Sequence, residues 1–274
     1  MRKTWAAFPY IGWMIIFTVI PLLLLLYFSV TVKTQSGIIY SLDNFHRFFE
    51  PIYIKVLIRS LLLAGISTVL CLVLGYPTAM ILAGLKLRHK DTLVLLMVLP
   101  MWMNFLLRTY AWLTILERKG LINTLLGHIG IAPLNLLYND FAVILGMIYN
   151  FLPFMVLPIY SVLSKIDHSL VEAAEDLGAD PVQTFAKITF PLSLPGVVSG
   201  ITMVFMPAVT TFVISRLLGG GQYTLIGNLI EQQFLTVGDW NFGSAISVVM
   251  MLIILIGMGF TSRYEKGQEG GGLW

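Results

Sequence analysis

Side chains able to do chemistry are sparse in this chain, and the densest group of carboxylates lies at residues 169–195, between two long apolar runs. Such groups can act as acids and bases, hold a hard metal ion or pair with a partner's Lys or Arg. The histidines are scattered without metal-ligand spacing, and no serine-nucleophile motif is present. Docking is therefore favoured over catalysis. The carboxylates are Glu172, Glu175, Asp176 and Asp180, and the histidines are His46, His89, His128 and His168.

Capping signals predict that this polar segment begins with a short helix. Ser169 and Glu172 have the spacing of a capping box, in which each side chain bonds to the other residue's backbone amide. The helix should end at Gly178, because glycine readily adopts the left-handed conformation that follows a helix.

A second helix is expected to begin with Asp180 as N-cap and Pro181 as first residue, and to end near Pro191. The pair of helices has three possible uses. A plain structured loop would use its carboxylates only in caps, and a helix lying on lipid is disfavoured because acidic residues would meet a negative inner leaflet. A protein-docking surface agrees best with the acidic rim, and the small residues Ala173 and Ala174 leave room for a partner's side chains.

The surrounding composition is that of an integral membrane protein. Of 274 residues, 57% are hydrophobic and 11% are charged, whereas a soluble domain carries roughly 25% charged residues. The formal net charge of +3 agrees with basic loops held on the cytoplasmic side and not with nucleic-acid binding. The single cysteine, Cys71, can form no internal disulfide.

Six apolar runs are long enough to cross a bilayer, which takes about 20 residues. We therefore expect an all-α, polytopic membrane protein with six transmembrane helices. The first run exceeds a signal peptide's apolar region and shows no cleavage site, so it should be retained. Six spans put both termini on one side, and nine basic residues against seven favour that side as cytoplasmic. The runs are residues 4–32, 60–85, 92–116, 141–164, 193–215 and 240–262.

The runs divide the chain into three predicted parts. Residues 1–59 hold the first helix and an external segment. Residues 60–266 form a five-helix core that contains a cytosolic loop at residues 165–192. Residues 267–274 are glycine-rich and are expected to be disordered.

The third predicted span is the most polar. In a continuous helix, Asn104 and Arg108 share one face. A charge at the bilayer centre costs about 3 kcal/mol on insertion scales, so Arg108 should face the bundle interior or reach outward. Arg108 either forms a packing ion pair with Glu117 or Asp140, or lines a substrate pathway beside aromatic rings that stack on cationic groups. The neighbouring face carries Trp102, Phe105, Thr109 and Trp112.

The polar segment also resembles a known family. Glu172-Ala173-Ala174 followed by Gly178, Ile188 and Pro191 resembles the EAA motif of ABC-importer permeases of the type I fold, with Phe190 where leucine often precedes the proline. The resemblance implies that the loop docks in a cleft of a cytosolic ABC ATPase dimer, and that the chain pairs with a second permease subunit. The coupling residues that it implies are Glu172, Ala173, Ala174, Asp176, Gly178 and Ala179.

Further motifs, over about residues 13–264, resemble the PotB-type permease subunits of spermidine/putrescine importers. That resemblance implies a polyamine substrate, an external substrate-binding lipoprotein or periplasmic protein, and a PotC-like second permease. An acidic residue stands at the position of Arg216 in some relatives, so a cation-binding role there does not carry over. The motifs are Leu99-Pro100 with Trp102, Asn104 and Arg108; LLGGG at 217–221 with Ile226-Gly227-Asn228; and Gly238-Asp239-Trp240 with Phe242-Gly243.

The sequence has no GxxxxGK[ST] phosphate-binding loop, because the glycines at 219–221 are not followed by lysine and a helix start. We therefore expect no enzyme activity and no cofactor or metal bound by this chain. ATP and Mg²⁺ would be bound by a separate ATPase subunit.

These observations predict a bacterial plasma-membrane permease, embedded in lipid, that moves polyamine by alternating access. The alternatives are the same kind of permease for an amino acid, a phosphonate or ferric iron, and an ion-coupled carrier, which would need carboxylates within the spans, where none occurs. Polyamines carry several positive charges, so their pathway should offer aromatic rings and carboxylates. The expected pathway residues are Trp102, Asn104, Arg108, Tyr110, Glu231 and Asp239.

Overall fold

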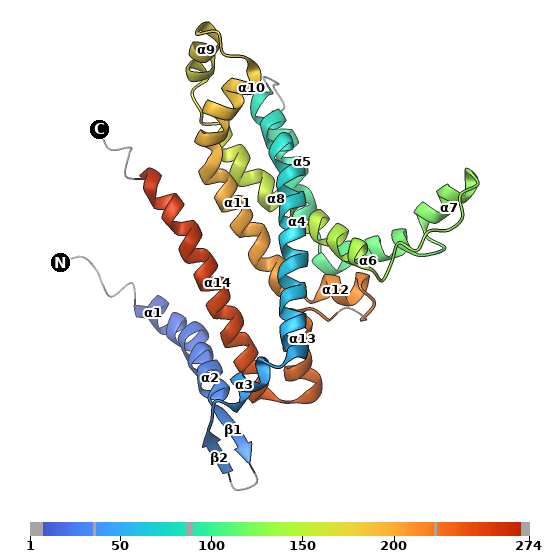
Figure 1. The fold of residues 1–274 in the computed structure, drawn as a ribbon, viewed down its shortest axis with the longest axis vertical. Coiled ribbons are helices and arrows are strands. Elements are labelled where there is room, and N and C mark those ends of the chain that lie inside the picture. The colour runs from blue at the N-terminus through green and yellow to red at the C-terminus, as the bar shows by residue number, and fades with distance from the viewer. Residues whose placement is uncertain (1–7, 35–36, 86–89, 222–223, 270–274) are drawn as a thin grey trace, which may run out of the picture.

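The computed structural model describes residues 8–34, 37–85, 90–221 and 224–269, and its regular elements there are helices and one short hairpin (Figure 1). The hairpin pairs β1 (Thr31–Thr34) antiparallel with β2 (Gly37–Tyr40). The helical elements are α1 (Phe8–Met14), η2 (Ile15–Val19), α2 (Ile20–Ser29), α3 (Asp43–Phe48), α4 (Pro51–Gly84), α5 (Lys90–Trp102), α6 (Phe105–Leu116), α7 (Leu121–His128), α8 (Asp140–Leu163), α9 (His168–Asp176), α10 (Pro181–Thr184), η3 (Phe185–Thr189), α11 (Phe190–Thr210), α12 (Val213–Leu218), α13 (Ile226–Gln232), η4 (Gln233–Val237) and α14 (Trp240–Glu269).

Length and composition make five of the described helices candidate membrane spans, and a bent pair adds a sixth if it counts as one span. The prediction of an all-α, six-span membrane protein is therefore confirmed, with the hairpin as a small addition. The spans are Phe8–Ser29, Pro51–Gly84, Asp140–Leu163, Pro181–Thr210 and Trp240–Gly259, and the bent pair is Thr92–Trp102 with Phe105–His128.

Three helices, α4, α8 and α11, form the centre of the bundle. Met155 of α8 is fully buried between them. The backbones of α8 and α11 approach closely at Gly196, where an added Cβ would lie 2.8 Å from the carbonyl oxygen of Pro158. Because any larger residue would force these helices apart, glycine permits this crossing.

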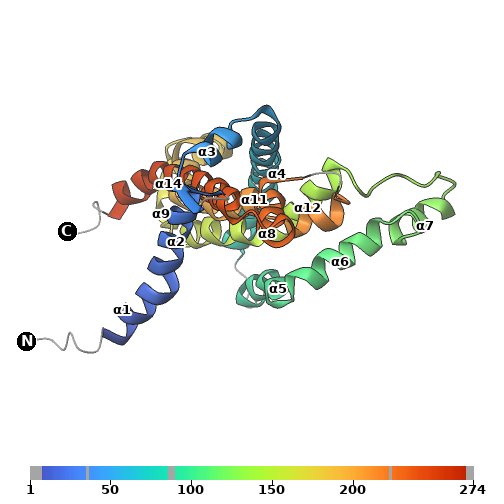
Figure 2. The ribbon, with the colours of Figure 1, turned by 90° about the horizontal axis from the view of Figure 1, so that it is seen from below.

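The remaining long helices lie at the periphery. α14 packs on α2 and α11, and Figure 1 shows it running from the hairpin towards the α9 end of the molecule. α1 and η2 contain no buried residue, and in α2 Ser29 alone is buried. In both Figure 1 and Figure 2, α6 and α7 lead away from the bundle.

The prediction of one straight third span is wrong. α5 ends at Trp102, α6 begins at Phe105, and the two helices meet at 90°. Asn104 between them is the N-cap of α6, and its Oδ1 accepts a hydrogen bond from the Leu106 amide at 2.8 Å. The residues on either side of Asn104 therefore do not share the faces expected of one continuous helix.

Several predicted boundaries also differ from the structure. α4 begins at Pro51, so a division at residue 59 falls inside a helix. The helix that starts at Pro181 continues through η3 into α11 and does not end near residue 191, so the loop at 165–192 includes its first turns. The fifth span ends at Thr210 rather than at residue 215. The tail is helical at residues 267–269, contrary to prediction, and residues 270–274 lie outside the described ones.

Candidate functional site

The candidate docking element consists of α9, the turn after it and α10, at one end of the molecule (Figure 1). Asp167 is the N-cap of α9, and its carboxylate accepts a hydrogen bond from the Ser169 amide at 3.0 Å. The predicted capping box of Ser169 and Glu172 is therefore wrong, because the helix starts earlier. Glu172 lies in the interior of α9, and its side chain is not the cap.

The turn between α9 and α10 is as the sequence predicted. Gly178 has a φ of +84°, in the left-handed region that favours glycine, and its amide donates to the carbonyl of Glu175 at 2.9 Å. Asp180 is the N-cap of α10 and accepts a hydrogen bond from the Gln183 amide at 2.8 Å. Pro181 occupies the first helical position. Two rigid caps thus hold the bend.

The docking element presents a mixed surface. Glu172, Ala173 and Asp176 are exposed, whereas Ala174 is buried and Ala179 is half-buried. Leu177 is 89% exposed and Val182 is 73% exposed, on either side of the glycine turn. Sequence reasoning missed these two apolar residues as surface features. An apolar tip within an acidic rim is typical of a surface that a partner covers.

A cluster of aromatic rings joins the docking element to the bundle. The rings of Tyr76 in α4, Phe185 in η3 and Phe190 in α11 have centroids 5.7, 5.9 and 6.0 Å apart. The Tyr76 hydroxyl is 2.8 Å from Oγ of Ser193, and both residues are buried. The spacing of the two phenylalanines did not point to this junction, because residues five apart do not meet in an α-helix.

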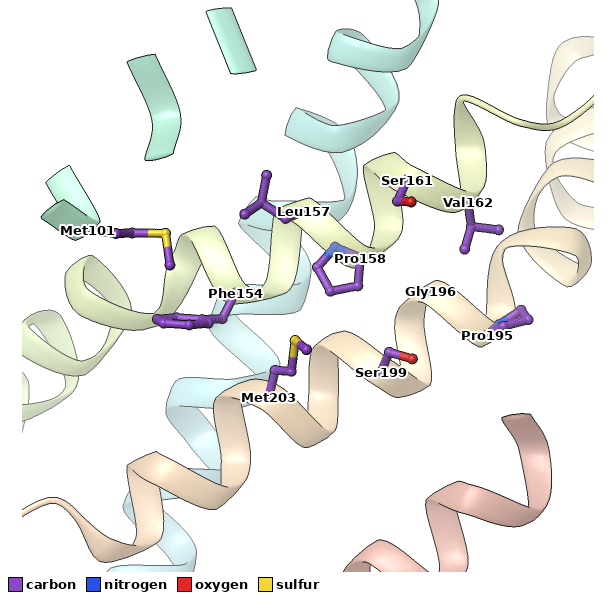
Figure 3. A pocket seen from close by; sticks show the side chains of 10 residues that line it. All are labelled: Met101, Phe154, Leu157, Pro158, Ser161, Val162, Pro195, Gly196, Ser199 and Met203. Atoms are coloured by element: carbon purple, nitrogen blue, oxygen red, sulfur yellow. The ribbon is translucent and has the colours of Figure 1, made fainter. Parts of the chain in front are cut away.

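A groove of about 560 Å³ runs between α8 and α11 and reaches the end of α5. In Figure 3, Met101, Phe154 and Met203 lie at one end of the groove, and the hydroxyls of Ser161 and Ser199 lie farther along it. Its walls are mainly apolar, with prolines at two positions. The remaining lining residues are Leu157, Pro158, Val162, Pro195 and Gly196.

The predicted outer carboxylates are both paired with arginine. Glu231 Oε1 accepts from Nη1 of Arg216 at 2.9 Å, and Asp239 Oδ2 accepts from Nη1 of Arg47 at 2.9 Å. The Arg47 guanidinium also lies 4.0 Å from the ring centroid of Phe242. Burial lowers the pKa of Arg47, but its hydrogen bonds with Tyr53 and Asp239 outweigh this and raise it, so the guanidinium stays charged.

A polar cavity of about 280 Å³ lies beside the first of these ion pairs. Glu231 is largely buried, and its second oxygen, Oε2, has no hydrogen-bond partner in the described part of the chain. The cavity is lined by Arg216, Gly221, Thr224, Asn228, Gln232 and Thr236.

The other four predicted pathway residues lie on α5 and α6 or between them. Trp102 is 75% exposed, Tyr110 is exposed, and Asn104 serves as a helix cap. Arg108 is only 8% exposed, and its Nε and Nη1 have no hydrogen-bond partner among the described residues.

Neither expected ion pair of Arg108 forms in the described structure, since Asp140 accepts from Arg59 at 2.7 Å and no contact with Glu117 is present there. No hydrogen bond, ion pair or ring contact within the described ranges joins the α5–α6 group to Glu231 or Asp239.

Solved structures with a similar fold are membrane components of ABC importers. A bacterial ABC transporter for the import of alginate superposes with a TM-score of 0.79 at 19% identity, covering 96% of each chain. The methionine transporter MetNI, in an inward-facing form, gives 0.54 at 17% identity, covering 80% of this chain and 99% of that one. At such identities the likeness shows the fold alone, and it is that of the type I importer permeases.

The chain belongs to the family of binding-protein-dependent transport system inner membrane components, which it matches over residues 75–269. It is thus a multi-pass membrane protein and the permease subunit of an ABC importer, as the EAA-like motif predicted. Similar relatives are the spermidine/putrescine transport system permease proteins PotB of Escherichia coli K12 and Haemophilus influenzae Rd. Each is 40% identical to this chain; the first match covers 89% of this chain and 90% of the relative, and the second covers 89% of both.

Proposed function

We propose that this chain is a membrane-spanning subunit of an ATP-driven importer of polyamines, spermidine and putrescine. The observation that carries the proposal is 40% identity to PotB relatives over 89% of this chain. Because the identity extends over nearly the whole chain, it includes the segments that would contact substrate as well as the docking element.

ATP and Mg²⁺ would be bound and hydrolysed by a separate cytosolic ATPase dimer, and this chain would bind no cofactor. The docking element supports this division of labour, because Leu177 and Val182 expose apolar side chains that a partner cleft would cover. The α9 end and both termini would face the cytoplasm of a bacterium, which is the orientation that the positive-inside rule favours.

The substrate would arrive at the hairpin end from an external binding protein and pass between this chain and a PotC-like permease. The α8–α11 groove supplies one apolar wall of such a path. Trp102 and Tyr110 are exposed and free to stack on an alkylammonium chain, and Glu231 keeps an oxygen without a donor. A polyamine ammonium would replace Arg216 as the partner of Glu231 during passage. Asn104, Arg108 and Asp239 would then shape the path rather than bind the cation.

The test is purification of the complete complex followed by uptake of radiolabelled spermidine into ATP-loaded liposomes. We expect an ATPase to co-purify, and uptake to require both ATP and the binding protein. Deletion of residues 169–195 should release the ATPase. A complex that hydrolyses ATP but imports an amino acid, phosphonate or ferric iron instead of spermidine would contradict the substrate, and uptake driven by an ion gradient without ATP would contradict the mechanism.

A further inference from the structure

The junction between the docking element and the bundle has an unusual backbone. In an α-helix, residues five apart point about 140° away from each other, so Phe185 and Phe190 would not meet. The π-helical turn η3 inserts one extra residue per turn and brings their ring centroids to 6.0 Å. Tyr76 of α4 completes the triangle, with its ring at 87° to that of Phe185.

Two prolines follow this turn in the same helix. Pro191 and Pro195 have no N–H, so the carbonyls of Lys187 and Pro191 lack the donor that an α-helix would supply. A π-turn followed by two prolines is a place where a helix bends with little resistance. A pull on α9 and α10 would therefore be absorbed here unless side chains tie the segment to its neighbour.

A hydrogen-bonded relay provides that tie. Ser193 Oγ donates to the carbonyl of Phe190 at 2.8 Å. A hydroxyl has one proton, so the Tyr76 hydroxyl, 2.8 Å from Oγ, must donate to Ser193. The relay runs from α4 through Ser193 to the first carbonyl of α11. Both side chains are buried, and a hydrogen bond is stronger in such a low-dielectric environment.

Open cavities lie around the π-turn. One of about 400 Å³ is lined by Tyr76, Phe185 and Phe190, and two of about 440 and 360 Å³ share Met80 and Thr189. The turn thus has room to shift its side chains, whereas the α8–α11 crossing at Gly196, about two turns farther along the helix, is tightly packed.

We propose that Tyr76 and Ser193 are positioning residues of the transport cycle. They hold α4 to the π-turn, so that a displacement of the docking element moves α4 and α11 together instead of being absorbed by the weak helical segment at residues 185–195. This inference rests on the proposed function, because it assumes that a cytosolic ATPase moves α9 and α10. It adds the residues through which that movement enters the bundle.

The test compares Tyr76→Phe and Ser193→Ala in the complete complex, in liposomes. Each removes one hydroxyl and keeps the packing. Ser67→Ala is the matched control, since Ser67 is also buried in α4 and makes an interhelical contact, to Sδ of Met147 at 3.2 Å. The readouts are ATPase recovery, spermidine imported per ATP hydrolysed, and hydrogen exchange of α9 and of residues 72–84 with and without ATP and vanadate.

We expect unchanged ATPase recovery in all three variants. Tyr76→Phe and Ser193→Ala should each lower spermidine imported per ATP about five-fold, as expected for the loss of one hydrogen bond. The double variant should be no worse than Ser193→Ala alone, because that variant already loses both the bond to Tyr76 and the bond to the Phe190 carbonyl. Nucleotide should change exchange at α9 and at residues 72–84 in the wild type, and at α9 alone in the two variants.

Unchanged coupling and exchange in both variants, an equal loss in Ser67→Ala, or additive losses in the double variant would overturn the inference. A wild-type complex that shows the nucleotide-dependent exchange in both segments but imports no spermidine would contradict the proposed substrate alone, and the exchange comparison would still decide the relay. A wild type that binds no ATPase would contradict both.

Discussion

The docking element and the hairpin end of this molecule use their carboxylates in opposite ways. At the hairpin end, Glu231 and Asp239 pair with Arg216 and Arg47, and the second of these ion pairs joins residues 192 positions apart in the chain. At the docking element, Asp167 and Asp180 cap the helices that carry them.

This contrast between ion pairs and helix caps shows which end has side-chain links to other parts of the chain. The ion pairs link α12 to α13, and α3 to the residue that precedes α14. Local caps fix the shape of the docking element, which is joined to the bundle by the helix that continues from Pro181 and by the aromatic junction. The hairpin end is therefore suited to receive a folded binding protein, and the docking element is suited to be moved.

The comparison predicts its largest effect at the apolar tip. Leu177→Asp should lower recovery of the ATPase at least about ten-fold, because a carboxylate would be buried without a partner in the docking cleft. Leu235→Asp, at a 78% exposed leucine of η4, is the matched control and should leave recovery unchanged. Pull-down of the complex measures ATPase recovery in both variants. Equal losses in the two would contradict the assignment of ATPase docking to the α9 end alone.

Smaller effects on uptake and stability should distinguish the role of Glu172, a contact with the ATPase, from that of Asp167, the cap of α9. Glu172→Ala should lower uptake several-fold, because this exposed carboxylate would contact the ATPase. Expression should stay normal, because Asp167 and not Glu172 caps α9. Asp167→Ala should instead cost about 1 kcal/mol of stability. Uptake assays and thermal denaturation of the purified complex distinguish the two. Expression that collapses in Glu172→Ala would mean that this carboxylate stabilises the helix.

At the hairpin end, Glu231→Gln keeps the shape of the side chain and removes its charge. Initial uptake of spermidine at low concentration should fall about three- to ten-fold, because a charge-assisted hydrogen bond to an ammonium is lost. ATPase recovery should stay normal, since α13, which carries this residue, lies at the opposite end of the molecule from α9 (Figure 1). An unchanged apparent KM for spermidine would exclude Glu231 from the pathway.

The smallest effect is expected for Asp239→Asn. The ion pair with Arg47 is partly exposed, and such pairs contribute about 0–1 kcal/mol. The variant should melt slightly lower at low salt, and the difference should shrink at high salt because the charges are screened. Asparagine keeps an acceptor oxygen for the Phe242 amide, so a large loss at both salt concentrations would mean that the ion pair itself contributes more than a surface pair does.

Local signals in the sequence were sufficient for much of the docking element. Gly178, Asp180 and Pro181 act as predicted, because a left-handed turn and an N-cap depend on neighbouring residues alone. The start of α9 was misjudged because Asp167 and Ser169 are both capping residues, two positions apart. Only the conformation of the chain before Asp167 decides between them.

Features that depend on contacts between distant segments could not be predicted from the sequence. The ion pair of Asp140 with Arg59, and not with Arg108, follows from the packing of α8 on α4. The bend at Asn104 carries a signal that could have been used, since asparagine is a strong N-cap residue and follows Pro100 closely. The relay of Tyr76 and Ser193 joins residues 117 positions apart.

The unbroken helical segment Pro181–Thr210 has a consequence for how the transporter responds to its lipids. Its 30 residues extend about 45 Å, whereas the hydrocarbon core is about 30 Å thick. About 15 Å of this helix therefore extends beyond the acyl chains. In a bilayer a few ångströms thicker or thinner, the helix would change its tilt, or a different length of it would lie in water. We therefore expect the docking element to remain in water over the usual range of membrane thickness.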